Sequence, residues 1–477
     1  MTVALDLDDI QGLIVRGYCR LGIARLLFLG IADPAAARRW LAAVADEITP
    51  GRADPDDASM HVAFTYAGLE KLGLHPEALA TKFPQEFVKG MTTDHRRRQL
   101  GDLDGNAPEH WSWGGPTTSP VHLVQLLYAK DEQVLKATAE RHERAREGLV
   151  TVKQLADTVD LDRKEHFGFH DGISQPLIEG LPKAGPLADP DTVRAGEIIL
   201  GYKNGYDRYT ERPLLPAAAD PSGLLPRDPE GSGAADLGRN GSYLVIRQLR
   251  QHVRDFWQFL DRATRRPDGS GDEAALLRLA AKMVGRWQSG APLVMAPDQD
   301  VPALADANDF EYAHADVDGY RCPIGAHVRR ANPRDSLDPD PGSQRSVDVG
   351  KGHRILRRGR AYGQPLSRDA ALAGTAAGQD GDGDRGLYFM CLNANIARQF
   401  EFIQHTWVNN AKFGGLYDDP DPVIAAGRGL GSTFTVQAIP VRQRVTAVPS
   451  FVDVVGGAYF FLPGIRAVRY LASLDGA

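Results

Sequence analysis

The sequence contains very little cysteine, and its cysteines are poorly placed for crosslinking. Among 477 residues there are three, Cys19, Cys322 and Cys391, an odd number at wide spacing. Neither a CxxC pair nor a CxxCH motif occurs. The sequence therefore gives no indication of a disulfide framework, a cysteine-based metal site or a cofactor attached through cysteine.

Long apolar runs and an excess of basic residues are also absent. No apolar run approaches the roughly 18 residues that a membrane-spanning helix requires. The formal net charge is −7, so composition does not favour a nucleic-acid partner. Residues 1–9 are acidic and lack the basic and apolar segments of an export signal. We therefore expect a cytoplasmic protein that binds neither membrane nor nucleic acid.

A strand followed at once by an amphipathic helix is the most regular local pattern. Residues 24–29 are typical of a buried strand, and Asp33 and Pro34 supply a helix N-cap and a first-turn proline. Apolar residues then recur at i, i+3, i+4 and i+7, namely Ala37, Trp40, Leu41 and Val44. Further strands are predicted at residues 61–66, 121–128, 242–246, 387–392 and 457–462.

Because strands alternate with single helices in both halves, we predict an α+β fold, each half a sheet with helices on one face. Two stretches rich in Gly, Pro and Asp, residues 186–240 and 335–384, interrupt the order. The first suggests a boundary between an N-terminal domain, 1–225, and a C-terminal domain, 226–477. The second stretch directly follows a segment around His327, described next, and is expected to help cover whatever binds there.

The segment around His327 has the features of a cofactor-binding site. A Cys322-Pro323 turn and a small-residue step, Gly325-Ala326, precede the histidine, and basic residues follow at Arg329, Arg330 and Arg334. A neutral imidazole can hold a haem iron from one side, and an arginine can pair with an acidic group of the same cofactor. Taken alone, the segment fits a core histidine in a basic loop better.

Two further segments carry unusual chemistry. In residues 165–176, Asp171 lies among aromatic and glycine residues, which can bring a carboxylate close to a flat ligand, although Asp-Gly turns are common. His166 and His170 are four apart, but the glycines argue against a helix and so against a metal pair. Residues 353–363 contain five basic side chains, usually a solvated or phosphate-binding surface. Within them, Ile355-Leu356 suggests a short strand that directs one arginine inward.

Together these segments resemble the dye-decolourising peroxidases, a haem family, over nearly the whole chain. Residues 168–172 fit the family's GxxDG motif, 325–329 resemble its proximal histidine segment, and 355–363 resemble its distal arginine segment. Residues 8–18 and 459–464 resemble its opening and its closing strand. The resemblance implies two ferredoxin-like halves, with a non-covalent haem b in the C-terminal half.

The resemblance also implies a role for each candidate residue. His327 would be the axial iron ligand, and Asp171 and Arg357 would face the open side of the iron. Asp421 would accept a hydrogen bond from His327, although Asp418 and Asp419 are close enough in sequence to take that role. The remaining cofactor contacts would be Arg334 with a haem propionate, and Leu387 and Phe389 lining the distal pocket.

The implied function is reduction of hydrogen peroxide coupled to one-electron oxidation of aromatic dyes and phenolic compounds. Asp171 would carry the proton as acid and base, and Arg357 would stabilise charge during O–O cleavage. Because aspartate has a reference pKa of about 3.9, we expect the best activity in the acidic range. The alternatives are a protein that removes iron from haem and a haem binder without turnover. Trp407 and Tyr388 are candidate radical sites, core packing being favoured for Trp407, and an oligomer is possible.

Overall fold

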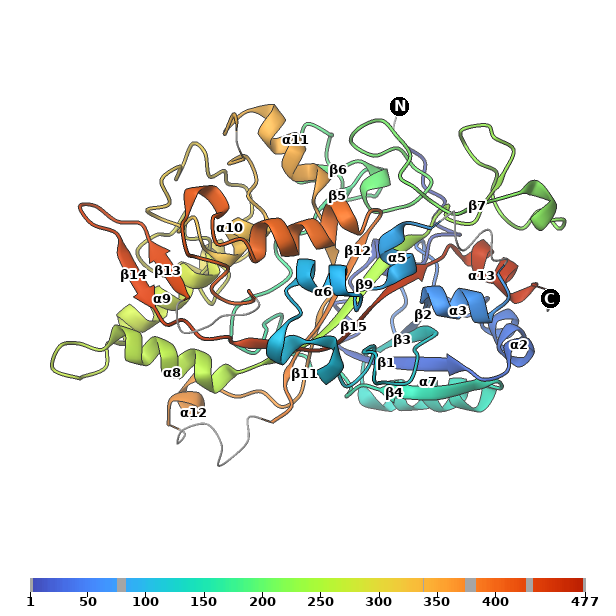
Figure 1. Cartoon of the computed structure of the whole chain (residues 1–477), viewed down its shortest axis with the longest axis horizontal. Coiled ribbons are helices and arrows are strands. Elements are labelled where there is room, and N and C mark those ends of the chain that lie inside the picture. Colours follow the sequence, from blue (N-terminus) through green and yellow to red (C-terminus); the bar gives the residue numbers. More distant parts are fainter. Residues whose placement is uncertain (1–2, 75–82, 338, 374–382, 426–431, 475–477) are drawn as a thin grey trace.

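A single antiparallel sheet of nine strands forms the centre of the molecule. The computed structural model describes residues 3–74, 83–337, 339–373, 383–425 and 432–474. The strand order is β10-β12-β9-β15-β2-β3-β1-β4, with β11 also paired to β12. Figure 1 shows the N-terminal strands at one end of this sheet and the C-terminal strands at the other.

The N-terminal end of the sheet is a ferredoxin-like unit. Its chain order is strand, helix, strand, strand, helix, strand, and its spatial order is β4-β1-β3-β2. The elements are β1 (Ile23–Ile31), α2 (Pro34–Val44), β2 (Ala58–Phe64), β3 (Leu123–Ala129), α7 (Glu132–Ala145) and β4 (Leu149–Gln154). As predicted, Asp33 caps α2 by accepting hydrogen bonds from two backbone N–H groups, with Pro34 in the first turn.

The C-terminal end repeats this architecture with the spatial order β15-β9-β12-β10. Its elements are β9 (Ser242–Gln251), α8 (Val253–Thr264), β10 (Leu356–Arg357), β11 (Arg360–Tyr362), β12 (Gly386–Asn393), the π-helical turns η6 (Ala397–Glu401) and η7 (Ile403–Val408), and β15 (Val452–Leu462). The predicted α+β class and the two ferredoxin-like units are thus confirmed. The strand predicted at 242–246 continues to Gln251, because it pairs with β15 from Val452 onward.

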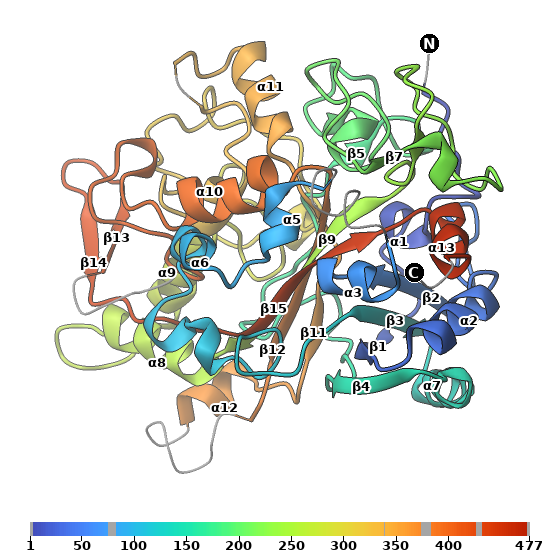
Figure 2. The same cartoon turned by 45° about the vertical axis from the view of Figure 1, so that its right-hand side comes forward.

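The two units share one sheet, whereas the sequence suggested a separate sheet in each half. They meet where β15 pairs with β2, through Phe461 and Phe64. The last helix, α13 (Ile465–Ala472), packs on α2 of the first unit (Figure 2). The domain boundary near residue 225 stays a prediction, because the central sheet is continuous between the two halves.

Each face of the sheet has its own apolar core. On the first face, α2, α7, α13 and η6 pack on the sheet through side chains such as Trp40, Leu135, Val468 and Phe400. The opposite face is covered by α1 (Gly12–Val15) and by apolar side chains of the long loop between β4 and β9, including Ile178 and Ile198. The predicted placement on one face is therefore correct for α2, α7, α13 and η6, and long loops complete the other face. Helix α8, which was predicted to follow the same pattern, packs instead with α9 (Glu273–Val284) and α12 (Arg368–Ala373) in a separate apolar core.

The amino-terminal segment ties the two units together. The side chain of Gln11 donates hydrogen bonds to the carbonyls of Val62 and Pro463, both at 2.9 Å. Asp9 accepts from the Asn240 side chain at 2.7 Å and from the Arg466 backbone N–H. These buried contacts explain why residues 8–18 form a distinctive opening sequence.

The remaining helices and strands lie outside the two ferredoxin-like units. The second Gly-, Pro- and Asp-rich stretch contains two helices and two strands, among them the short strand predicted at Ile355-Leu356, which the structure places at Leu356–Arg357. Residues 338 and 374–382 of this stretch lie outside the described chain. No helix among the described residues is long and apolar enough to span a membrane. The other elements are α3 (Tyr66–Lys71), α5 (Gln85–Lys89), α6 (Asp94–Leu100), β5 (Leu177–Ile178), β6 (Thr192–Val193), β7 (Leu214–Leu215), β8 (Ala235–Asp236), α9 (Glu273–Val284), α10 (His327–Ala331), α11 (Gln344–Gly352), α12 (Arg368–Ala373), β13 (Thr433–Val436), β14 (Gln443–Thr446) and the short 3₁₀ turns η1 (Asp104–Asn106), η2 (Pro108–His110), η3 (Ala195–Glu197), η4 (Ala217–Ala219), η5 (Pro302–Leu304) and η8 (Phe413–Gly415).

Candidate active site

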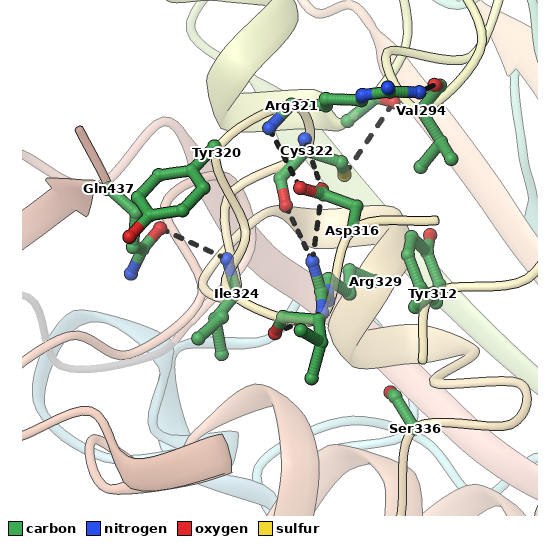
Figure 3. Close-up of polar contacts among 12 residues, drawn as sticks. Val294, Tyr312, Asp316, Tyr320, Arg321, Cys322, Ile324, Arg329, Ser336 and Gln437 are labelled. Atoms are coloured by element: carbon green, nitrogen blue, oxygen red, sulfur yellow. Dashed lines mark hydrogen bonds and ion pairs between the residues drawn. The ribbon is translucent and has the colours of Figure 1, made fainter. Parts of the chain in front are cut away.

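The turn that leads into His327 is held by a buried aspartate. Asp316 accepts hydrogen bonds from the backbone N–H groups of Arg321, at 2.9 Å, and Cys322, at 2.7 Å. Its carboxylate also pairs with the guanidinium of Arg329 at 3.3 Å, and Figure 3 shows these contacts converging on the turn. The Arg329 guanidinium lies over the ring of Tyr312, 4.5 Å from its centroid. Arg329 is therefore a buried brace of the turn.

Arg330, in helix α10, connects that helix to neighbouring segments through buried hydrogen bonds. Its side chain is fully buried and donates to the carbonyls of Gly325 at 3.1 Å, Trp407 at 2.8 Å and Asn410 at 2.9 Å, and also to that of Asp419. These four acceptors belong to the His327 segment, η7 and the loop that follows it. The basic residues after His327 are thus largely structural, a role that their composition did not reveal.

His327 begins α10 and forms a hydrogen-bonded pair with Asp421. Its Nδ1 lies 2.9 Å from Asp421 Oδ2, and Asp421 is wholly buried. The other oxygen of Asp421 accepts from the N–H groups of Val423 and Ile424, both at 2.9 Å, which fixes the carboxylate. Burial lowers the pKa of His327, but the charge and hydrogen bond of Asp421 outweigh it, so the pKa is raised overall.

The three neighbouring aspartates have different environments. Asp419 is buried but accepts hydrogen bonds from the Thr433 hydroxyl and the Thr435 backbone N–H. Asp418 is exposed and lies 3.6 Å from Arg444. Of the three, Asp421 is therefore the residue that the structure places against His327.

Asp171 and Arg357 form a second hydrogen-bonded pair. Arg357 Nη1 donates to Asp171 Oδ1 at 2.6 Å, and the Gly172 N–H donates to the same oxygen at 2.6 Å. Burial raises the pKa of Asp171, but the charge and hydrogen bond of Arg357 lower it by more. The pKa of Asp171 therefore lies below its usual value. Both groups act electrostatically on His327, Asp171 raising and Arg357 lowering its pKa. The two pairs are therefore close in space.

Strand β12 supplies apolar side chains beside Arg357. Arg357 of β10 is opposite Cys391 of β12, and Leu387 and Phe389 share the strand face of Cys391 because side chains alternate along a strand. Leu387 and Phe389 are partly exposed, whereas Tyr388 and Met390 on the other face are buried. This arrangement fits a flat apolar ligand beside the Asp171–Arg357 pair.

Several guanidinium groups concentrate positive charge next to these pairs. Arg334 donates to the carbonyls of Asn308 at 2.9 Å and Phe310 at 3.1 Å. Arg354 is 8% exposed, and its Nη2 is buried without a hydrogen-bond partner in the described structure. Burial, and then the Arg334 and Arg357 charges, lower the pKa of Arg354 despite the raising effect of Asp191. An anionic group here would balance the cluster.

These observations fit a non-covalent haem. His327, with Nδ1 engaged by Asp421, can offer Nε2 to an iron. The cationic cluster with the unpartnered Arg354 nitrogen suits haem propionates. Arg354 lies in the basic segment already singled out, but only its burial and unpartnered nitrogen distinguish it from its neighbours.

The other candidates from the sequence lie inside the fold. Trp407 is 5% exposed and makes edge contacts with the rings of Phe402 and His353. Tyr388 is fully buried and stacks on Tyr362 with centroids 4.3 Å apart. Neither side chain lies at the surface. His166 and His170 do not share a partner. A ring nitrogen of His166 lies near the Tyr362 carbonyl, and a ring nitrogen of His170 lies near the Ser289 carbonyl.

No family model matches the chain, but individual proteins and solved structures are similar to it. A dye-decolorizing peroxidase of Mycena epipterygia is 30% identical, over 98% of this chain and 88% of its own length. A solved structure of a dye-decolorizing peroxidase in complex with 2,6-dimethoxyphenol superimposes with a TM-score of 0.77, at 27% identity, over 98% of this chain and all of the other. The deferrochelatase of Yersinia pestis is 26% identical, over 57% of this chain and 43% of its own length.

Fold, paired residues and relatives define the class of protein as a peroxidase, an oxidoreductase that uses hydrogen peroxide. Within that class, the similarity at 30% identity over nearly the whole chain identifies the family. The chain belongs to the dye-decolourising peroxidase family.

Proposed function

We propose that the protein is a haem b peroxidase in which Asp171 moves the proton and Arg357 stabilises negative charge. The observation that carries the proposal is the hydrogen-bonded Asp171–Arg357 pair, which acts electrostatically on the His327–Asp421 pair. His327 would hold the iron, and Arg334 and Arg354 would hold the propionates. The bound haem would supply the redox chemistry with peroxide.

Asp171 suits proton transfer because its carboxylate stays ionised at low pH. The lowered pKa, set by Arg357 against the opposing effect of burial, leaves the base available in the acidic range. Asp171 would take the proton from one peroxide oxygen and return it to the other, which leaves as water. This supports the expectation of activity under acidic conditions.

Arg357 stays cationic and presents Nη1 to the same carboxylate. Its backbone N–H is fixed by the Gln175 side chain at 2.9 Å, so the strand residue is held in place. Such a preorganised cation would stabilise the charge that builds on oxygen as the O–O bond breaks. On the other side, Asp421 would keep the His327 imidazole oriented and electron-rich.

The proposed reductants are phenols and aromatic dyes. Peroxide takes up two electrons and two protons to give two waters, so each of two phenol molecules gives up one electron and one proton. The relative bound to 2,6-dimethoxyphenol supports this substrate class. Leu387 and Phe389 offer apolar surface next to the proton-transfer pair.

Iron removal from haem is the second candidate function, and the partial similarity to a deferrochelatase favours keeping it. Haem-loaded protein given peroxide and 2,6-dimethoxyphenol separates the two. A peroxidase oxidises the phenol and keeps its iron, whereas iron removal releases fluorescent metal-free porphyrin. A passive haem binder produces neither signal.

The variant Asp171→Asn tests the proton-transfer role directly. Asparagine keeps the shape but cannot take a proton, so the rate of the peroxide step should fall about 100-fold or more, with haem content unchanged. Asp157→Asn is the matched control, because Asp157 pairs with Arg25 at 2.6 Å outside the site. A normal peroxide rate in Asp171→Asn would show that another group carries the proton.

A further inference from the structure

The turn that carries Asp171 is built around the carboxylate of Glu165. Glu165 accepts from the backbone N–H groups of Phe167, at 2.8 Å, and Phe169, at 2.9 Å. Its own N–H donates to the Phe169 carbonyl at 3.0 Å, and Asp171 N–H donates to the Arg163 carbonyl at 2.8 Å. The position of Asp171 therefore depends on a loop closed by the Glu165 side chain.

A glutamine of the central sheet completes the set of donors. Gln251, the last residue of β9, donates from Nε2 to Glu165 Oε2 at 2.6 Å. The other amide atom, Gln251 Oε1, is buried and has no hydrogen-bond partner in the described structure. Glu165 thus meets three donors, and an unused acceptor lies on the same amide.

This arrangement can accommodate two protonation states. An ionised Glu165 uses all three donors, and such charge-assisted bonds are about twice as strong as neutral ones. A protonated Glu165 has an O–H to donate, and rotation of the Gln251 amide would present Oε1 to accept it. The unpartnered oxygen is therefore explained if the carboxyl group carries a proton for part of the time.

The surroundings place this proton equilibrium near neutrality. Burial, aided by the negative charge of Asp171, raises the pKa of Glu165 to about 7 against the lowering effect of the three hydrogen bonds. Besides Asp171 and Gln251, the neighbours are His166, whose pKa is lowered by burial, and Arg385. Arg385 acts on His166, and its carbonyl accepts from the Gln251 N–H at 3.0 Å.

We propose that Glu165 and Gln251 form a proton-dependent switch that positions Asp171. Ionised Glu165 holds the turn rigid, and its negative charge makes Asp171 a stronger base. Protonated Glu165 weakens its hold on the turn and removes that charge. Glu165 is thus a positioning residue for the peroxide step, a role that rests on the proposed function, although the switch itself does not.

The switch is tested first by stability, independently of turnover. A carboxyl whose folded pKa is raised stabilises the fold below its unfolded pKa, and this contribution is lost as pH rises through the folded value. The melting temperature of the haem-loaded protein, relative to Glu165→Gln, should therefore fall as pH rises from about 4.5 to about 7 and then level off. Absence of this step overturns the proposal.

Two glutamine variants of β9 sharpen the assignment. Gln251→Leu removes a hydrogen bond that lowers the Glu165 pKa, so the stability step should move to higher pH. Gln248→Leu is the matched control, because Gln248 on the same strand accepts from Trp113 Nε1 at 2.9 Å and should leave the step in place. A step that moves equally in both variants contradicts the switch.

The rate of the peroxide step then tests the link to Asp171. In place of the acidic optimum expected from the sequence, the switch predicts that the wild-type rate of this step keeps rising, roughly tenfold, as Glu165 ionises near pH 7, since displacement of a reacting group by about 1 Å can cost about 100-fold. Glu165→Gln should lack this rise. A stability step without any peroxide reaction would refute the proposed function and leave the switch intact; a rise that persists in Glu165→Gln would refute the positioning role.

Discussion

At the scale of single residues, the site depends on pairs whose members set each other's charge. Burial alone would raise the pKa of Asp171, and Arg357 reverses this effect. Burial alone would lower the pKa of His327, and Asp421 reverses that effect. The pKa of each group is therefore set by a charged neighbour distant in the sequence.

Removal of the arginine charge should change the pH dependence of the peroxide step. In Arg357→Leu, burial acts on Asp171 without the opposing charge, so its pKa rises. The acid limb of the pH–rate profile, measured by rapid mixing with peroxide, should then move to higher pH. Arg357→Lys, which keeps the charge, should shift the limb less. An acid limb that stays in place in Arg357→Leu would mean that Asp171 is not the group that titrates.

At the scale of secondary-structure elements, α10 is held between two sets of buried contacts. Asp316 and Arg329 fix the turn before it, while Arg330 connects it to η7 and to the loop that carries Asp421. These contacts determine where His327 meets Asp421. Because Arg330 binds backbone carbonyls, which any sequence supplies, no side-chain motif could have revealed this role.

The brace can be tested with Arg330→Met. This change removes the Arg330 donors from four carbonyls, of which that of Asn410 keeps another donor, the Phe413 N–H. Since hydrogen bonds to charged groups contribute about 1.5–3 kcal/mol each, the free energy of unfolding should fall by at least about 3 kcal/mol. Denaturant unfolding measures this, and haem retention on gel filtration should fall too. Arg321→Met is the control, because exposed Arg321 has a side-chain bond to the Val294 carbonyl. Equal losses in both variants would argue against a special role for Arg330.

At the scale of the whole molecule, the candidate site is assembled from both halves of the chain. Asp171 precedes the predicted boundary near residue 225, while Arg357, His327 and Asp421 follow it. The shared sheet and the buried contacts of Gln11 and Asp9 fix the position of one half relative to the other. The activity therefore requires the intact chain.

Local patterns in the sequence predicted the strand–helix units, because burial on one face enforces a period of two or 3.6 residues. The segments that carry Asp171, His327 and Arg357 could be singled out by composition, but their roles came from the family resemblance. Asp421 was likewise named by the resemblance, since spacing could not choose it over Asp418 and Asp419. Two features were not predictable: the joining of β2 to β15, and the unpartnered nitrogen of Arg354. Each depends on contacts between residues far apart in the chain.

The central claim is that His327 holds a haem, and the haem content of His327→Ala tests it most directly. Purified wild-type protein reconstituted with haem should bind one haem with a sharp Soret band. The variant should lose most of the haem or show a displaced Soret band, whereas His314→Ala, at an exposed histidine nearby, should match the wild type. Full haem occupancy with an unchanged Soret band in His327→Ala would contradict the account.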